Sequence, residues 1–578
     1  MLLLWLMACG PPPDRPDVVV VTWDTVRADL ATPATAPGLH GLGGRVFRQA
    51  RTTVPVTLPA HASLLTGRWA AGHGARNNGV QTLDPDIPTL AEALKARGYR
   101  TGAFVSASVL RRRYGLGRGF DVYDDALPEG TYERDGVDTL AAAAAWMDAL
   151  PGRDPRFVWV HLYDPHRPWP VTDDQTDPYI AEISRVDALT TAWTAHLRME
   201  RTVLVVTSDH GEGLGDHGED SHGNFIYDST MRVPLHVIWG EKVEAPWPAG
   251  VDDRPVSLVD IAPTLAALAG SPFPSDGVDL TRTTPDRALA METMMPALNY
   301  GIAPLYGVVE DGQVWISAPR AERYALSPDP AQQQNLFTPD QAPALDERLR
   351  QFDWDIETAL SSAAPSDEEA AQLAALGYVQ LEGSPDRDID PKDITDVFGL
   401  GLEHRELLTG PGAAERLALL RAMHPTGSLR AQLARIQALE LVAPAIRERE
   451  AALLRDLGRR KEAEDLEGRP DPSRRQRNQL RDRIAQHIQA NPADADARYD
   501  LAVTLHWLED GGAEAAYRQA LALRPEDAAT RQGLAVLLMQ RGDFAAAQEA
   551  AKGLGCLEEK VQIEAGARTS ASSSCGPG

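Results

Sequence analysis

Cysteine is scarce in this chain, whose 578 residues include only three: Cys9, Cys556 and Cys575. Thiols so few and so far apart give neither a disulfide framework nor the closely spaced ligands of a zinc cluster. Long apolar runs are missing as well, because no stretch approaches the roughly 20 apolar residues that a transmembrane helix needs. The sequence therefore excludes a disulfide-stapled scaffold and predicts no membrane-spanning helix.

Basic residues are also under-represented. The 57 Lys and Arg residues face 83 Asp and Glu residues, which leaves a net charge of −26. Such a charge repels nucleic acid and anionic lipid over most of the surface, so we expect no nucleic-acid partner. An anionic substrate would need a locally positive site, and bound metal ions would supply one.

The first residues resemble a bacterial lipoprotein signal. Residues 6–9 (LMAC) end a short apolar run and match a lipobox, in which the cysteine, here Cys9, becomes the acylated first residue of the mature protein. No Lys or Arg precedes the run, so an ordinary apolar N-terminus is the alternative. We predict residues 1–16 as lipoprotein signal and tether, a location in the bacterial cell envelope (lipid-anchored, periplasmic or secreted), and membrane contact only through the N-terminal lipid anchor.

Apolar runs typical of buried strands recur along the first half of the chain. They alternate with helical patterns such as residues 88–97, where Gly98 suits the position after a helix. Strands that alternate with helices predict an α/β fold with a mostly parallel, doubly wound sheet between helices. The predicted strands are residues 17–23, 99–105, 156–163, 202–208 and 233–239.

Three of these strands lead directly into polar side chains of the metal-binding type. The first leads to Asp24, the third to Asp164 and His166, and the fourth to Asp209 and His210. Ligands of open α/β sheets bind at the carboxyl ends of the strands. Carboxylates and imidazoles bind divalent metals. We therefore expect these side chains to converge on one edge of the sheet.

The segment TLPAHASLLTG (57–67) predicts a helix that starts at a threonine. Pro59 suits the first turn and Gly67 suits the stop. Thr57 then lies where backbone N–H groups and the helix dipole favour negative charge. Its hydroxyl can cap the helix, which is the common role there, or serve as a nucleophile whose anionic product faces the same donors.

Six motifs, in this order and spacing, resemble the sulfatases of the alkaline phosphatase superfamily over residues 17 to about 340. They are WDTVRAD (23–29), TLPAHASLLTG (57–67), HLYDPHRPW (161–169), TSDHGEGLGDHGE (207–219), YDSTMRVPL (227–235) and VSLVDIAPTLAALAG (256–270). The resemblance implies that Asp24, Asp209 and His210 are metal ligands and that Thr57 is both ligand and nucleophile. It implies that His166 contacts the substrate's anionic group, and His222 falls near a position where the family often has a substrate-binding Lys.

The chain departs from that family at three positions. Sulfatases convert a Cys or Ser to formylglycine, but a threonine such as Thr57 cannot form that aldehyde, so no formylglycine is expected. The motif's usual Arg is His61, which could act in catalysis or be a buried, hydrogen-bonded residue, and the usual second Asp is Thr25. A Thr nucleophile resembles the phosphodiesterase and phosphomonoesterase branches, which use two zinc ions. Candidates for a second site are Asp164, His166 and His222.

The second half of the chain predicts a different architecture. Residues 300–337 suggest antiparallel strands and turns, and residues 366–376 a helix. A pattern with Pro492, Asp494 and Ala502 recurs 33 residues later and resembles the tetratricopeptide repeat, which binds protein or peptide partners. The predicted domains are a sulfatase-like catalytic domain (17–380), a linker (381–392), an all-α tetratricopeptide-like region (393–562, clearest at 491–552) and a disordered tail (563–578).

Three functions remain open at this point. The first is a metal-dependent hydrolase of sulfate-type esters, with Thr57 attacking and His61, His166 or His222 steadying the oxyanion or protonating the leaving group. The second is a two-metal phosphodiesterase, phosphomonoesterase or phosphonate hydrolase. The third is a non-catalytic, lipid-anchored binding scaffold. The metal would be Ca²⁺ in a sulfatase-like site and Zn²⁺ in a phosphodiesterase-like site.

Overall fold

The computed structural model describes residues 15–354 except 80, 129–130, 171–176, 283–285 and 301. It also describes residues 387 and 390–392, several residues between 481 and 492, 495–552 except 509, and residue 561. The predicted signal, the helix at 366–376, most of the linker, most of 393–485 and the tail lie outside the described residues. The chain divides into two compact units, residues 1–420 and 421–578.

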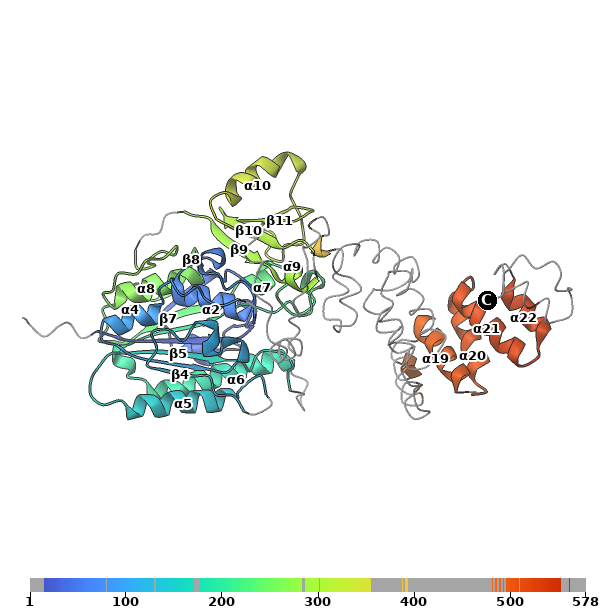
Figure 1. The fold of residues 1–578 in the computed structure, drawn as a ribbon, viewed down its shortest axis with the longest axis horizontal. Helices are drawn as coiled ribbons and strands as arrows, with labels where there is room; N and C mark the ends of the chain where they lie inside the picture. Colours follow the sequence, from blue (N-terminus) through green and yellow to red (C-terminus); the bar gives the residue numbers. More distant parts are fainter. Residues whose placement is uncertain are drawn as a thin grey trace, which may run out of the picture. The chain divides into compact units, whose positions relative to one another are not determined.

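The described part of the first unit is built on an eight-stranded sheet (Figure 1). Its central strands β3, β5, β1 and β6 are parallel neighbours, as the apolar runs predict. In sheet order the strands are β4 (Val122–Asp124), β3 (Arg100–Val105), β5 (Arg156–Leu162), β1 (Asp17–Trp23), β6 (Thr202–Ser208), β7 (Leu235–Trp239), β2 (Arg45–Arg51) and β8 (Gly250–Ser257).

One predicted strand runs in the opposite direction. The strand expected at 233–239 is β7, and it pairs antiparallel with β6. Between the two strands the chain forms only short helical turns, among them α7 (Asp228–Met231). A parallel return requires a crossover, usually a helix packed on the sheet, whereas an antiparallel neighbour does not. Strands β2, β4 and β8 were not predicted, because charged residues interrupt their apolar pattern.

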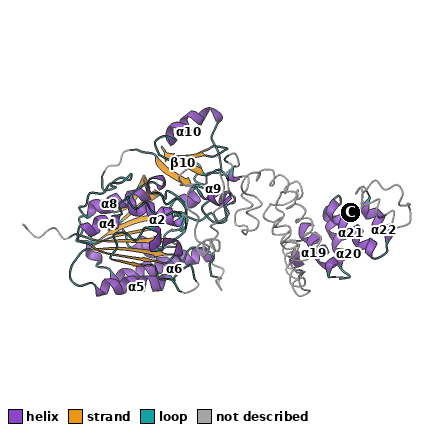
Figure 2. Ribbon diagram, in the orientation of Figure 1, coloured by secondary structure: helices purple, strands orange, loops and turns teal. Residues whose placement is uncertain are grey.

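Helices cover both faces of this sheet (Figure 2). Val18 and Val20 of β1 face one core with α2, α4 and α8, whereas Val19 and Val21 face the other with α1, α5 and α6. A strand buried on both faces reads as a continuous apolar run, which is why β1 was recognisable. The helices are α1 (Pro37–Gly41), α2 (Thr57–Thr66), α3 (Ala70–His73), α4 (Leu90–Ala96), α5 (Gly136–Ala149), α6 (Pro178–Trp193) and α8 (Ile261–Leu268).

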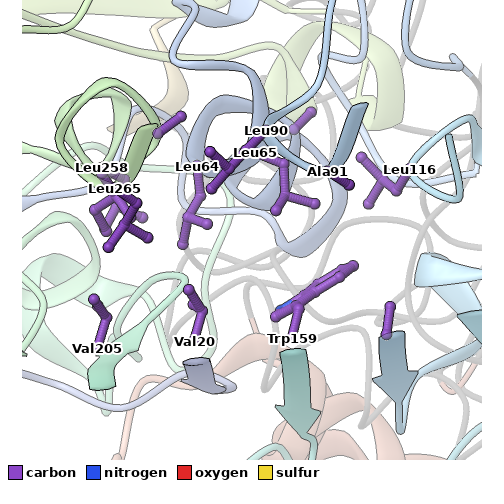
Figure 3. Packing of buried hydrophobic residues seen from close by; sticks show 14 of the residues in the cluster. Val20, Leu64, Leu65, Leu90, Ala91, Leu116, Trp159, Val205, Leu258 and Leu265 are labelled. Atoms are coloured by element: carbon purple, nitrogen blue, oxygen red, sulfur yellow. The ribbon is translucent and has the colours of Figure 1, made fainter. Parts of the chain in front are cut away.

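Packing on the first of these faces fixes the position of α2. Figure 3 shows Leu64 and Leu65 of α2 pointing toward Val20 of β1 and Trp159 of β5. These side chains are at most 1% exposed. Because burying each large apolar side chain contributes about 1.5–3 kcal/mol, this packing holds α2 firmly against the sheet.

A second, antiparallel sheet follows the first. Its order is β12 (Glu322–Ala325), β11 (Gln313–Ser317), β10 (Leu305–Glu310) and β9 (Leu289–Thr293), and α9 (Met295–Tyr300) and α10 (Ala342–Leu349) accompany it. The antiparallel strands expected within 300–337 are thus confirmed, and β9 adds a strand that precedes them.

The described part of the second unit contains helices α19 (Ala495–Trp507), α20 (Ala513–Leu523), α21 (Ala528–Gln540) and α22 (Phe544–Ala551). Ala502 and Ala535, which occupy equivalent positions of the 33-residue repeat, are both fully buried. The tetratricopeptide assignment stays a prediction. Among all the helices that the structure describes, none is long and apolar enough to cross a membrane.

A buried ion pair joins the loop after α3 to the second sheet of the first unit. Arg76, in the loop after α3, donates through Nε and Nη2 to the Glu292 carboxylate of β9 at 2.6 and 2.8 Å. Both side chains are 3% exposed. Arg48 and Asp253 form a pair of the same two-pronged geometry on the surface, with side chains 59% and 62% exposed.

Replacing Arg76 with Leu leaves the Glu292 carboxylate buried and unpaired, which we expect to cost about 3–5 kcal/mol of unfolding free energy. Arg48→Leu is the matched control, and we expect it to cost less than about 1 kcal/mol because its pair is solvated. Urea denaturation of both variants measures the difference. Equal losses would contradict this account of the junction.

Candidate active site

The carboxyl ends of β1 and β6 bring two acids and a histidine together. Asp24 follows β1 directly, and Asp209 and His210 follow β6. All three are fully buried. One ligand atom from each lies within 4.8 Å of one from each of the others, so the trio can hold a metal ion. The convergence predicted from the motifs is therefore present.

Each of the two carboxylates has one oxygen tethered and one without a partner. Asp24 accepts a hydrogen bond from His161 through Oδ2 at 3.1 Å, and its Oδ1 has none. Asp209 accepts from the backbone N–H groups of Thr25 and His210 through Oδ1, at 3.1 and 2.8 Å, and its Oδ2 has none. Buried polar atoms without partners are rare and costly. Two such oxygens in one cluster indicate a place for a cation.

The ring of His210 is oriented with one nitrogen toward the same place. Nδ1 lies 2.9 Å from the Gly211 carbonyl oxygen, which can only accept, so Nδ1 carries the proton. Nε2 is then a bare lone pair, 3.5 Å from Asp209 Oδ2 and 3.4 Å from Thr57 Oγ1. A ligating histidine is commonly oriented in this way by a hydrogen bond from its other nitrogen.

Thr57 is the first residue of α2, and its hydroxyl does not cap the helix. The N-cap is Val56, which makes no side-chain cap. Asn78 supplies the acceptor instead, because its Oδ1 accepts from the Leu58 N–H at 2.8 Å. The capping alternative for Thr57 is therefore wrong. Its hydroxyl lies 3.4 Å from His210 Nε2.

His61, one turn further along α2, is fully buried and hydrogen-bonded on both sides. Its Nδ1 donates to the Thr57 carbonyl at 2.8 Å, and its Nε2 accepts from the Thr22 hydroxyl at 2.9 Å. Burial lowers the pKa of His61 to about 3, so the ring is neutral. These contacts favour a role in positioning Thr57.

His161 is a site residue that the motif reading missed. It lies in β5 opposite Thr22 of β1, and its ring centroid is 4.9 Å from that of His61. With Asp209, these two histidines form a second group of potential metal ligands. Strand alternation was the available signal, since it places His161 on the same face as Trp159, toward α2.

Thr25 stands at the position where the family usually has its second Asp. Its backbone is left-handed, with φ 58°, a conformation that costs a β-branched residue about 1–3 kcal/mol. The conformation directs its N–H to Asp209, and its hydroxyl lies 3.1 Å from the Pro165 carbonyl oxygen. The backbone of Thr25 thus serves the site, and its side chain does not.

His166 and His222 extend the cluster beyond His210. The ring centroid of His222 is 4.3 Å from that of His210 and 5.2 Å from that of His166. The Glu212 carboxylate lies 3.4 Å from His222 Nδ1. Burial alone would raise the pKa of Glu212, but the adjacent His222 and His166 lower it. The predicted substrate-contacting residues are thus beside the candidate metal ligands.

Asp164 lies apart from both groups of potential metal ligands. Its Oδ1 is paired with the Arg185 guanidinium of α6 and accepts from the Gly136 N–H at 3.2 Å. An arginine beside the carboxylate already supplies the positive charge that a metal would bring. The structure therefore does not bring the proposed ligand Asp164 to Asp24 and Asp209.

The electrostatics of the cluster also favour a cation. Burial and the facing Asp209 carboxylate raise the pKa of Asp24 well above its usual range. Two buried like charges at this separation repel each other unless a cation lies between them. Asp24, Asp209, His210 and Thr57 offer oxygen and imidazole donors that suit a divalent metal.

A mixed α/β sheet with helices on both faces and this cluster at its carboxyl edge fits the alkaline phosphatase and sulfatase fold. A solved structure described as a complex with its substrate D-glucosamine-2-N,6-O-disulfate shares the fold, with a TM-score of 0.50 and 16% identity over 61% of this chain and 99% of that one. The family model "Sulfatase" matches residues 16–271, which include every candidate site residue. These findings support placing this segment in the sulfatase family of the alkaline phosphatase superfamily.

Curated relatives agree with that placement. The extracellular sulfatase SULF-1 homolog of Drosophila melanogaster is 23% identical over 45% of this chain and 30% of its own length. Human arylsulfatase A is 26% identical over 48% of this chain and 70% of its own length. The chain therefore spans less than a third of the fly protein that it matches.

The loop after His210 contains one further buried acid, Glu219. Its carboxylate accepts from the N–H groups of Asn224 and Phe225 at 2.7 and 3.3 Å. Burial raises its pKa from an ordinary 4.5 to about 8. Unfolding between these two pH values releases a proton, so the stability that this group contributes is complete below about pH 4.5 and lost as pH rises through 8.

Replacing Glu219 with Gln keeps an acceptor oxygen but removes the titration. In the natural chain, this titration should lower the unfolding free energy by up to about 1.4 kcal/mol per pH unit between pH 5 and 8. We expect that part of the decline to be absent from the variant. Denaturation series across this range measure the slope, with the exposed Glu241→Gln as control. Parallel profiles for all three proteins would refute the assignment.

Proposed function

We propose that this chain is a metal-dependent, sulfatase-family hydrolase of anionic, sulfate-type esters, with Thr57 as the nucleophile. The observation that carries the proposal is the Thr57 hydroxyl. It is released from helix capping and lies 3.4 Å from a bare imidazole nitrogen, beside two carboxylates that each keep one unpartnered oxygen. The names of the relatives support the sulfate-ester class.

Asp24, Thr57, Asp209 and His210 are the residues that would hold the metal. When bound there, a divalent metal would lower the pKa of the Thr57 hydroxyl and offset charge on an anionic substrate. An all-oxygen set would suit Ca²⁺, whereas the His210 imidazole favours Zn²⁺ or another transition metal.

The chain's own residues divide the remaining work. His61 holds the Thr57 carbonyl, which fixes the first turn of α2 and with it the direction of the hydroxyl. The Thr57 hydroxyl releases its proton to solvent, its Oγ1 forms a bond to the sulfur or phosphorus atom, and the bond to the leaving oxygen breaks. His222 donates a proton to that oxygen, whereas His166, whose pKa burial lowers to about 3 and whose Nδ1 donates to the Arg167 carbonyl, is neutral and contacts the substrate's anionic group. Water then cleaves the Thr57 ester and restores the hydroxyl.

A phosphoester is the alternative substrate, and Thr57 itself favours it. Formylglycine is an aldehyde whose hydrate carries two hydroxyls on one carbon. When one of them bears the sulfate, the other can lose its proton and reform the aldehyde, which breaks the C–O bond and expels sulfate. A threonine ester has no such route, so water must attack the sulfur or phosphorus atom directly. A phosphodiesterase, phosphomonoesterase or phosphonate hydrolase with a Thr nucleophile fits this constraint.

The rest of the chain extends the proposal. We propose residues 17–380 as the catalytic domain, and an envelope location with a lipid anchor at Cys9. The fly relative's description as extracellular is compatible with that location. The helices of 393–562 are proposed as tetratricopeptide-like repeats that bind a protein or peptide partner.

Replacing Thr57 with Ala removes the nucleophile, and we expect turnover to fall by about 10³-fold or more with unchanged thermal stability. Thr57→Ser keeps a hydroxyl and should stay within about tenfold of the natural chain. Rates on matched aryl sulfate, phosphate monoester and phosphate diester substrates, with metal analysis of the same samples, identify the substrate class. Full activity of Thr57→Ala would exclude this mechanism.

His161→Phe removes the donor to Asp24 while it preserves the ring volume, and we expect metal affinity to fall about 10- to 100-fold. His161→Gln restores a donor and should recover most of the loss. His236→Phe, at a buried histidine of β7 outside the site, is the control. Chelator competition after metal removal gives the affinities. Unchanged affinity in His161→Phe would show that this tether is dispensable.

A further inference from the structure

The opposite edge of the large sheet contains an open cleft of about 1170 Å³. It lies where β1, β5 and β6 begin, because Arg15, Arg153 and Arg201 precede these strands and line it. Arg97, just after α4, lines it as well. We call this feature the arginine cleft, defined by Arg15, Arg97, Arg153 and Arg201.

These four arginines form no ion pair within the part of the chain that the structure describes. Four other charged residues of the lining are paired with each other, Lys242 with Glu200 and Arg282 with Asp279, and a fifth, Arg198, pairs with Asp17 outside the lining. Glu244 is left as a lining acid without such a pair among the described residues. The arginine cleft thus has a clear excess of positive charge on a chain whose net charge is −26.

The hydrogen bonding of Arg201 and the pKa of Arg156 both reflect this concentration of positive charge. Arg201 Nε is buried without a hydrogen-bond partner. Burial, followed by the adjacent Arg198, lowers the pKa of Arg156, the first residue of β5. Guanidinium groups crowd together only at an electrostatic cost, which an anion at the arginine cleft would relieve.

We propose that the arginine cleft docks on the anionic headgroups of a membrane surface, a second contact beyond the N-terminal anchor that the sequence alone predicts. A membrane is the proposed binding partner because Arg15, which lines the cleft, comes only six residues after Cys9, the predicted acylation site. Six extended residues span at most about 20 Å. A chain anchored at Cys9 therefore keeps the arginine cleft at the headgroup layer, where each basic residue contributes about 1 kcal/mol of attraction.

The proposal also orients the enzyme. The central strands are seven residues long in β1, β5 and β6, which places the two sheet edges about 23 Å apart. With the amino edge on the membrane, the candidate active site at the carboxyl edge faces away from it. Soluble or cell-wall substrates would then have access, rather than lipids of the same membrane.

The test uses the full chain with Cys9→Ser, so that acylation does not contribute. We expect it to sediment with vesicles of phosphatidylcholine and phosphatidylglycerol at low salt, but not with phosphatidylcholine alone or at high salt. Arg97→Glu combined with Arg153→Glu changes two exposed, unpaired residues and should weaken binding at least about tenfold. Arg48→Glu combined with Arg350→Glu changes the net charge equally elsewhere and should bind like the parent.

Three results would overturn the proposal. The first is equal vesicle binding by the parent and the Arg97/Arg153 variant, and the second is an equal loss in the Arg48/Arg350 control. The third is saturable binding of inorganic phosphate, abolished by the Arg97/Arg153 changes, without any vesicle binding, which would make the cleft a site for a small soluble anion. None of these readouts involves catalysis, so each is distinct from failure of the proposed hydrolase activity.

Discussion

The candidate site depends on two buried carboxylates that face each other at the ends of adjacent strands. Asp24 and Asp209 cannot both be charged there without compensation. On each carboxylate, one oxygen accepts hydrogen bonds and the other has no partner. His161 donates to Asp24, and two backbone N–H groups donate to Asp209. Even the strained backbone of Thr25 serves this arrangement. The neighbouring geometry is therefore that of a shell around a cation.

The Thr57 hydroxyl is available to the site because other residues make the hydrogen bonds that the first turn of α2 needs. A threonine at the start of a helix normally caps it, and a capping hydroxyl would point back at the helix N–H groups. Asn78 takes over that function from a loop beyond α3, and His61 holds the carbonyl of Thr57 from within α2. With both backbone demands met by other residues, the hydroxyl is directed at His210. Both ring nitrogens of His61 are hydrogen-bonded, to the Thr57 carbonyl and the Thr22 hydroxyl, so a neutral histidine is accommodated where related motifs have an arginine.

Sequence patterns anticipated the features that local chemistry specifies. Strands buried on both faces, such as β1 and β6, read as continuous apolar runs, and the helix that begins at Thr57 has its Pro and Gly in place. Features set by distant partners escaped prediction. The antiparallel direction of β7 depends on how the chain returns after β6, the cap from Asn78 depends on a loop 20 residues away, and Asp164 looks like a metal ligand until Arg185 of α6 is placed beside it.

A parallel sheet separates the beginning of each central strand from its end, and this topology links the site to the arginine cleft. Arg15 precedes β1, whereas Asp24 follows it, so Arg15 and the candidate metal ligands lie at opposite edges of the sheet. A strongly acidic surface disfavours contact with an anionic membrane except where cations gather. Cations gather at the amino edge, as the arginine side chains of the cleft, and are required at the carboxyl edge, between Asp24 and Asp209. The amino edge is therefore locally positive, whereas the carboxyl edge carries two facing acids that a cation would balance.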